Sequence, residues 1–319
     1  MLHLRVITPA DRTSAVVELL TGNEGVTNLV VMAGAARRPA GDLVLFDVAR
    51  EAANGVIDCL KDLGLEQEGS IAIEHVDLSV SRVADEAEAA VPGAPDDAVV
   101  WEDLSRQVSG DCRITWAFLA FLTIATHLAA IGVLLPSLIL IVGAMVLGPE
   151  FGAVAAVSFG LLRGDREMIG SALRALAIGF GVAIAITTLS ALAAHWLDWI
   201  PSLARHDEVD FIVKPDRWSF IVALLAGAAG VLSVTAGKSS ALVGVFISVT
   251  TVPAAGYAAL AIALGQWGDV IGSVGQLGIN IAGMVISGTL VLFLQRFFWA
   301  RHGLRVAAPT PGRRHGSSV

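Results

Sequence analysis

The sequence predicts an α-helical multi-pass membrane protein with six transmembrane helices in an inverted 3+3 repeat, following an N-terminal α+β ferredoxin-like domain. Three observations support this fold class. The 319-residue chain is 55% hydrophobic with a mean hydropathy of +0.72, above the ~45–50% apolar share of soluble proteins. Charge is divided unevenly, with a net −11 in residues 1–110 and +3 in residues 111–319. The second part also contains six apolar runs, each near the ~20 residues needed to cross ~30 Å of hydrocarbon.

The acidic first part has the pattern of a small sandwich. Alternating and β-branched runs predict strands, and apolar residues at helical spacing between Pro9 and Gly22 and before Gly64 predict helices. The order βαββαβ is typical of a ferredoxin-like fold, which by itself assigns no function. The predicted strands are 2–8, 25–34, 41–49 and 70–80, and the predicted helices are 9–22 and 50–64.

Composition divides the chain into four parts. We expect a cytoplasmic βαββαβ domain over 1–80 and an acidic linker with a juxtamembrane helix over 81–112. A six-helix transmembrane domain over 113–298 and a disordered basic cytoplasmic tail over 299–319 follow. The acidic front excludes nucleic acid as a partner, because phosphates require cationic contacts. The two cysteines, Cys59 and Cys112, fit a reducing compartment and predict neither a disulfide framework nor a metal site, and no cofactor motif is present.

The loops of the membrane part predict its orientation. The apolar runs are 115–135, 137–162, 169–197, 218–236, 239–264 and 270–295. Basic residues gather in the turn at 163–166, at Lys238 and in the tail, so the positive-inside rule places both termini in the cytoplasm of a bacterial inner membrane. Four tryptophans cluster at the opposite boundary, as interfacial aromatic residues do: Trp196, Trp199, Trp218 and Trp267.

Segments 2 and 5 resemble each other, which predicts the repeat. Pro149 and Pro253 are each followed 15 to 16 residues later by a Gly-Asp pair, and each pair leads shortly into Ile-Gly-Ser. Three helices per copy would give the copies opposite orientations in the membrane. Inverted repeats with paired helix breaks are typical of secondary transporters, and the breaks mark the substrate site. The predicted breaks are Gly148, Pro149 and Pro253.

These stretches resemble a family of bacterial membrane proteins called domain of unknown function 389. The resemblance rests on Ala129–Leu135, Ile141–Pro149, the Gly164-Asp165 turn and Gly237–Gly244 followed by Val252-Pro253, and it covers roughly 100–298. It implies a multi-pass inner-membrane protein with a cytoplasmic N-terminal domain and implies no established activity. Family members usually carry an apolar or small residue after the Gly-Pro pair, so Glu150 is a departure from the pattern.

Glu150 is the main candidate for function, because it lies near the middle of the second apolar run. An ionised carboxylate in hydrocarbon costs at least ~2.5–3.5 kcal/mol, so Glu150 should face the bundle interior or water, or be protonated. One interpretation makes it a proton or cation site. The alternative makes it part of a helix break, where a carboxylate in the first turn favours the positive helix end. Both interpretations are compatible with one structure.

Other polar residues in the apolar runs are secondary candidates for a solute path. His127 is a candidate partner of Glu150 in a proton relay, or a histidine bonded to a neighbouring helix. Gln276 and Asn280 are four apart and share a helix face, where they line a path or bond across helices. Thr250 and Thr251 precede Pro253 and either coordinate a solute or satisfy carbonyls freed at the break.

The sequence therefore predicts a transporter or channel-like protein for a small solute or ion, with a cytoplasmic regulatory domain. The alternative is a membrane receptor or scaffold whose N-terminal domain binds a ligand or partner and which moves no solute. An enzyme is not expected, because no nucleophiles or metal ligands converge in the sequence. The expected partners are the lipid bilayer and the solute, and homo-oligomerisation is left open.

Overall fold

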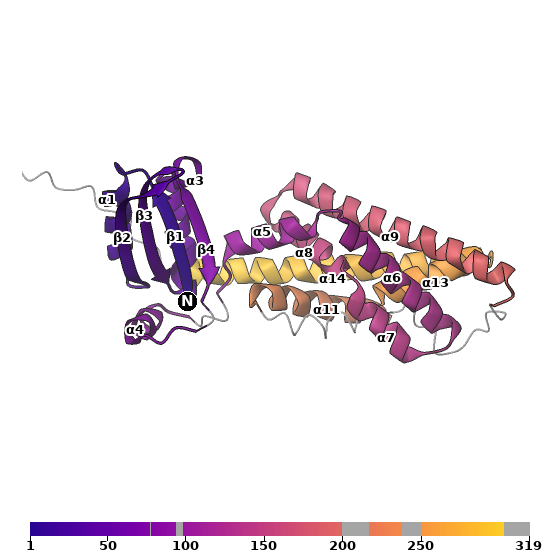
Figure 1. The fold of residues 1–319 in the computed structure, drawn as a ribbon. Helices are drawn as coiled ribbons and strands as arrows, with labels where there is room; N and C mark the ends of the chain where they lie inside the picture. Colours follow the sequence, from indigo (N-terminus) through magenta and orange to yellow (C-terminus); the bar gives the residue numbers. More distant parts are fainter. Residues whose placement is uncertain (77, 94–97, 200–216, 238–249, 303–319) are drawn as a thin grey trace, which may run out of the picture. The chain divides into compact units, whose positions relative to one another are not determined.

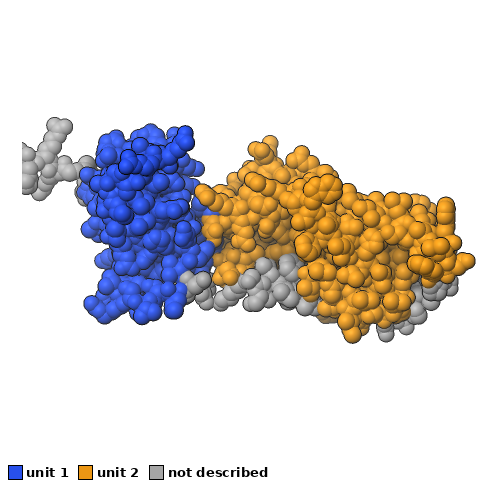
Figure 2. Space-filling view, viewed as in Figure 1, with its two compact units in different colours: residues 1–102, 297–319 blue, residues 103–296 orange. Residues whose placement is uncertain are grey.

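The computed structural model describes residues 1–76, 78–93, 98–199, 217–237 and 250–302. The chain forms two compact units, one made of Met1–Glu102 together with the chain from Phe297 onward, and one made of Asp103–Arg296. Figure 2 shows the two units in different colours.

The N-terminal unit is built on a four-stranded antiparallel sheet with helices between its strands. The strand order is β2-β3-β1-β4, with β1 at the centre beside β3 and β4. Its elements are β1 (Leu2–Thr8), α1 (Thr13–Thr21), β2 (Val26–Arg37), β3 (Ala40–Val48), α2 (Arg50–Asp62), α3 (Leu65–Glu68) and β4 (Ser70–His75). Figure 1 shows these elements in dark colours at the start of the chain. The predicted order βαββαβ is present, with the short α3 added after α2.

Alternation of apolar residues explains how this unit buries its core. Leu2, Leu4 and Val6 alternate along β1 and are fully buried, because successive strand residues point to opposite faces. They pack with the apolar residues of α1 and α2, including Val56 and Leu60. Two predicted boundaries differ from the structure by more than three residues. Residues 9–12 form a turn ahead of α1, closed by a backbone bond from residue 12 to residue 9, and the last strand ends at residue 75 instead of 80.

The region expected to be a linker is largely helical. Helix α4 (Arg82–Ala90) begins at the cap residue Ser81, whose side chain accepts a hydrogen bond from the Ala84 amide. Ala84 and Ala87 are buried, and Val91 joins the core of the N-terminal unit. Small apolar residues on one helix face explain why an acidic, alanine-rich segment folds onto this unit. Helix α5 (Trp101–Asp111) follows where the juxtamembrane helix was expected.

The second unit is helical. Its helices are α6 (Trp116–Leu134), α7 (Leu138–Leu147), α8 (Glu150–Arg163), α9 (Arg166–Trp196), α11 (Arg217–Thr235), α13 (Thr251–Ala263) and α14 (Trp267–His302). Four of them, α6, α9, α11 and α14, are long and apolar enough to cross a membrane, and α7 with α8 forms a bent pair that makes a fifth if it counts as one span. This count falls short of the six predicted spans.

The fifth predicted segment, 239–264, accounts for the difference. Its described portion is α13, whose 13 residues extend over ~20 Å at ~1.5 Å per residue, less than the ~30 Å hydrocarbon thickness. Residues 238–249, which hold the rest of that segment, lie outside the described residues, as do most of the 198–217 loop and residues 303–319 of the predicted tail.

Helices α8 and α13 run in opposite directions along α9. Near the start of α9, Ile169 packs against Gly160 of α8, where a Cβ would lie 2.8 Å from its side chain. Near its end, Thr188 Oγ1 donates a 3.2 Å hydrogen bond to the Ala259 carbonyl of α13. The two α9 residues are ~28 Å apart along the helix, so the far parts of the two short helices lie near opposite ends of α9. Residues of both short helices are buried almost throughout.

Candidate functional site

The second membrane segment is interrupted at Gly148 and Pro149. Helix α7 ends at Leu147, α8 begins at Glu150, and the two axes differ by 51°. A proline ring clashes with the preceding helical turn and lacks an N–H, so the helix restarts after Pro149. A Cβ at Gly148 would lie 2.2 Å from Glu150 Oε2. The Glu150 side chain therefore occupies space that only a glycine leaves at position 148.

Glu150 is buried and joins the starts of the two short helices. Its Oε1 accepts a 2.5 Å hydrogen bond from Thr251 Oγ1, and both residues are the first of their helices. From its start, α8 extends ~15 Å to Gly160, and α13 extends ~12 Å to Ala259. The sum of these two lengths matches the ~28 Å between the α9 residues that Gly160 and Ala259 contact. The amino ends of α8 and α13 thus meet at Glu150, and the helices diverge from there. Pro253 lies in the first turn of α13.

A chain of side-chain hydrogen bonds continues from this junction to α14. Asn280 Nδ2 donates to Thr250 Oγ1 over 3.0 Å, and Gln276 Nε2 donates to Asn280 Oδ1 over 3.3 Å. Thr250 precedes Thr251 directly, so five of the six predicted path residues form one connected group. We call Glu150, Thr250, Thr251, Gln276 and Asn280 the junction cluster.

The sixth predicted residue, His127, does not join the cluster. Its Nε2 lies 2.9 Å from Ser190 Oγ, and its Nδ1 lies 2.9 Å from Thr187 Oγ1 and 3.0 Å from the Thr123 carbonyl oxygen. Both ring nitrogens are therefore engaged within α6 and α9, and the expected contact with Glu150 is not formed. His127 has the other predicted role, a histidine bonded to a neighbouring helix.

Helix α14 carries a longer buried polar face than the sequence analysis recognised. Buried polar residues are spaced by four, three, four and seven positions, so that they share one side of the helix. With a rise of ~1.5 Å per residue, this face extends over ~27 Å, nearly the hydrocarbon thickness. The regular spacing was visible in the sequence and would have identified it. We call these residues the α14 polar stripe: Asp269, Ser273, Gln276, Asn280 and Ser287.

Three side-chain atoms at this site have no hydrogen-bond partner among the described residues. They are Glu150 Oε2, Gln276 Oε1 and Ser273 Oγ. Gln276 and Ser273 are fully buried, and 5% of Glu150 is exposed. Because buried polar groups in folded proteins almost always have partners, these three atoms are able to bond a further group.

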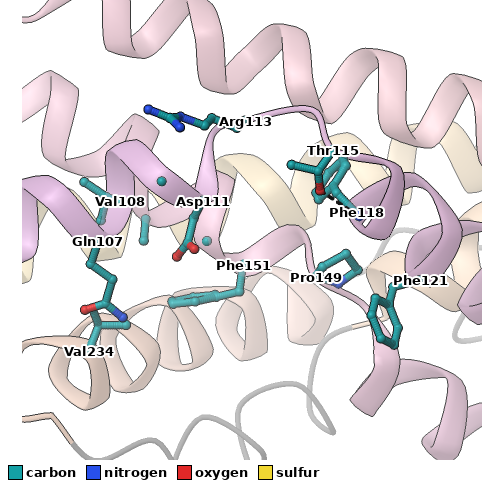
Figure 3. Close-up of a pocket in the computed structure, with 13 residues that line it drawn as sticks. Gln107, Val108, Asp111, Arg113, Thr115, Phe118, Phe121, Pro149, Phe151 and Val234 are labelled. Carbon is teal, nitrogen blue, oxygen red and sulfur yellow. Dashed lines mark hydrogen bonds between the residues drawn. The ribbon is translucent and has the colours of Figure 1, made fainter.

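A pocket of about 350 Å³ lies on the other side of the first turn of α8. Pro149, Phe151 and Gly152 line it, while the side chain of Glu150, between them in sequence, is turned to Thr251. Figure 3 shows the Asp111 carboxylate directed toward the ring of Phe151. The remaining lining residues are Gln107, Val108, Gly110, Arg113, Thr115, Phe118, Phe121, Ala155 and Val234.

The pocket places charge beside the start of α8. A Cβ at Gly152 would lie 2.6 Å from the Asp111 Cβ, so Asp111 packs directly on the bare backbone of the first helical turn. Partial burial raises the pKa of Asp111. In the part of the chain that the structure describes, no three His, Cys, Asp or Glu side chains come together to hold a metal ion. Sequence reasoning missed this pocket, because its residues come from four separate helices.

Comparisons with known proteins place these features in a family. Residues 145–286, which contain the whole junction cluster, match the family model described as "Domain of unknown function (DUF389)". An uncharacterised protein of Methanocaldococcus jannaschii, MJ0678, is 23% identical over 236 residues, which cover 72% of this chain and 71% of that protein. No solved structure gives a significant match. The resemblance seen in the sequence is confirmed, because residues 145–286 match the DUF389 family model.

Proposed function

We propose that this protein moves a small solute or ion across a membrane, through a path between the α8–α13 junction and α14. The observation that carries the proposal is the meeting of two helix starts at the buried Glu150–Thr251 hydrogen bond. Interrupted helices in corresponding positions are the arrangement that secondary transporters use to build a substrate site. A carboxylate placed in such a region at a cost of at least ~2.5–3.5 kcal/mol indicates a functional role.

The opposite directions of α8 and α13 support the inverted repeat that we propose. Each helix starts at the junction, and each is followed after a short turn by a long helix, α9 after α8 and α14 after α13. The proposed repeat pairs the first three predicted segments, which are α6, the bent pair of α7 and α8, and α9, with the last three, whose described helices are α11, α13 and α14. The N-terminal unit supports a ferredoxin-like assignment through its antiparallel strand order, and we propose a regulatory role for it.

The orientation that we propose places both termini in the cytoplasm of a bacterial inner membrane. Trp196, Trp199 and Trp267 are strongly exposed near helix ends on the proposed outer side, as tryptophans of an interfacial belt are. Arg163 lies at the end of α8 that would face the cytoplasm. The pocket lined by Arg113 and Pro149 would then serve as the cytoplasmic entrance, and its volume is within the range of small-molecule sites.

The competing function is a receptor or scaffold that moves no solute. The burial of the junction cluster favours it, since Gln276 is 0% and Asn280 is 2% exposed. In a transporter the same burial describes an occluded state, in which the solute site is closed to both sides and the helices must separate to admit solute.

Flux into proteoliposomes distinguishes the two functions. The purified full-length chain would be tested with sodium, chloride, protons, urea and glycerol as probes, beside protein-free vesicles. We expect accelerated flux of at least one probe, and a change of about tenfold or more in Glu150→Gln, which corresponds to ~1.4 kcal/mol. No acceleration of any probe would favour the scaffold. Equal flux in wild type and Glu150→Gln would remove Glu150 from the path.

A further inference from the structure

When Glu150 is ionised, its charge and those of the two helix starts beside it nearly cancel. A helix start carries about +0.5 of an elementary charge, and two starts, those of α8 and α13, meet at the single carboxylate of Glu150. An ionised Glu150 therefore compensates both helix starts. Among the described buried side chains of residues 103–296, only Glu150 and Asp269 are acidic or basic. Asp269 lies at the far end of the α14 polar stripe, where Tyr257 Oη donates to it over 3.3 Å.

This balance is unfavourable to free ions of either sign. Two helix starts form a favourable site for an anion, but the carboxylate of Glu150 already occupies that site and repels a second negative charge. An entering cation meets the two positive helix starts. In a site of low dielectric constant an uncompensated charge is costly. An uncharged solute incurs neither cost.

The junction nevertheless offers hydrogen-bonding groups that are not used within the chain. Glu150 Oε2 and Gln276 Oε1 are acceptors without a partner among the described residues, and Ser273 Oγ, equally without one, is able to donate and to accept. The donor end of the Gln276 amide is engaged with Asn280 Oδ1, which leaves its carbonyl oxygen for another donor. Unpartnered acceptors at a buried site select a solute with N–H or O–H groups.

We propose that the junction cluster and the α14 polar stripe form a site for a small, uncharged solute that donates hydrogen bonds, with Glu150 holding the site electrically neutral. Urea and glycerol represent the solute class. The inference rests on the proposed function and narrows it, because it assigns the chemistry of what is moved. It also gives Glu150 a defined role, compensation of two helix starts.

The test uses the full-length chain in proteoliposomes, with urea and glycerol entry followed by stopped-flow light scattering and sodium and chloride entry followed by ion-sensitive dyes. Wild type is expected to raise urea or glycerol permeability at least tenfold over protein-free vesicles and to leave sodium and chloride permeability unchanged. Carriage of sodium or chloride without urea or glycerol would overturn this inference and leave the proposed function standing. Carriage of no probe would overturn both.

Two variants test the residues. Glu150→Gln leaves two helix starts uncompensated, so chloride permeability should rise about tenfold or more. Gln276→Leu removes an acceptor from the junction and should lower urea or glycerol permeability about tenfold, the factor given by ~1.4 kcal/mol. Gln295→Leu is the matched control, because Gln295 lies near the other end of α14, where it donates to Thr235 Oγ1.

Size-exclusion elution and circular dichroism establish that each variant is folded before flux is compared. If Glu150→Gln keeps the wild-type barrier to chloride, the compensation role is overturned. If Gln276→Leu and Gln295→Leu behave alike while wild type carries urea or glycerol, the solute does not contact the stripe, and the proposed site is overturned.

Discussion

Replacing Gly148 by alanine should break the Glu150–Thr251 hydrogen bond without touching either residue. Gly148 has extended backbone angles that alanine also adopts, so backbone strain plays no part. The added Cβ would lie 2.2 Å from Glu150 Oε2 and 2.8 Å from Val252 Cγ2. Ordinary contacts are ~3.5 Å, so the carboxylate must move by about 1 Å. A shift of that size lengthens the 2.5 Å bond beyond hydrogen-bonding range.

The expected cost follows from the chemistry of that bond. A hydrogen bond to a charged group contributes ~1.5–3 kcal/mol, so Gly148→Ala should lower the free energy of unfolding by about that amount. The assay is equilibrium unfolding in mixed detergent micelles. Gly143→Ala is the matched control, because Gly143 lies within α7 and a Cβ there meets nothing within 4 Å. Its free energy of unfolding should stay the same or rise by up to ~1 kcal/mol through better helix propensity.

A double substitution separates the two contacts of the new methyl group. In a Glu150→Ala background the clash with the carboxylate is absent, so Gly148→Ala should cost less than in the wild type. If Gly148→Ala is as stable as Gly143→Ala, the tight fit of Glu150 over Gly148 is refuted. If Gly148→Ala lowers the free energy of unfolding equally in the Glu150→Ala background, the loss comes from the contact with Val252, and the predicted clash with the carboxylate is refuted.

Three further predictions concern single side chains. Thr251→Val removes the donor to Glu150 and should lower the free energy of unfolding by ~1.5–3 kcal/mol, while Thr251→Ser keeps the donor; equal stabilities would contradict this. Burial raises the pKa of Cys112 to about 11. The rate of maleimide labelling at Cys112 should therefore be slow at pH 8 and rise about tenfold per pH unit. A labelling rate that stops rising by pH 9 would contradict a pKa this high. Hydrogen bonds from a backbone amide and then a threonine hydroxyl lower the pKa of Asp42. The ionised Asp42 carboxylate therefore stabilises the N-terminal unit above its unfolded pKa of ~4, and this stabilisation is lost as the pH falls below that value. The thermal unfolding temperature of Asp42→Asn should depend less on acid pH than that of the wild type. Identical pH profiles of the two proteins would refute this role of Asp42.

Much of the fold was predictable because apolar periodicity determines which residues are buried. The alternation in residues 2–8 and the apolar spacing in residues 50–64 predicted β1 and α2 to within about two residues. Boundaries were less accurate where they depend on capping and turns, as at residues 9–12. The helix in the expected linker was missed, because its buried face consists of alanines, which hydropathy does not separate from a flexible acidic segment.

The site was predictable in part for a related reason. Matching the two proline segments linked Pro149 with Pro253, and the structure brings the helix starts beside these prolines together at Glu150 and Thr251. The pairing of His127 could not be predicted, because α6 is apolar on all sides and its sequence does not determine which face meets which neighbour. In the structure, the side chain of His127 contacts α9.

The pocket also depended on tertiary structure. Asp111 and Gly152 are far apart in sequence and meet only because α5 ends beside the first turn of α8. Neither residue belongs to a sequence pattern that predicts this contact. By contrast, the α14 polar stripe has a regular period within a single helix, and a search for polar as well as apolar periodicity would have identified it.

The accessibility of the α14 polar stripe to water tests the central claim, a solute path past Glu150, most directly. Single cysteines would be introduced as Ser273→Cys, Gln276→Cys and Asn280→Cys into a chain whose two native cysteines are replaced by serine, and labelled in intact proteoliposomes with a membrane-impermeant thiol reagent. Val274→Cys and Leu290→Cys are controls, because these side chains are about half exposed on the outside of α14, where lipid would lie. The account predicts labelling of the stripe at least tenfold faster than that of the controls. A stripe that labels no faster than Val274→Cys would contradict it.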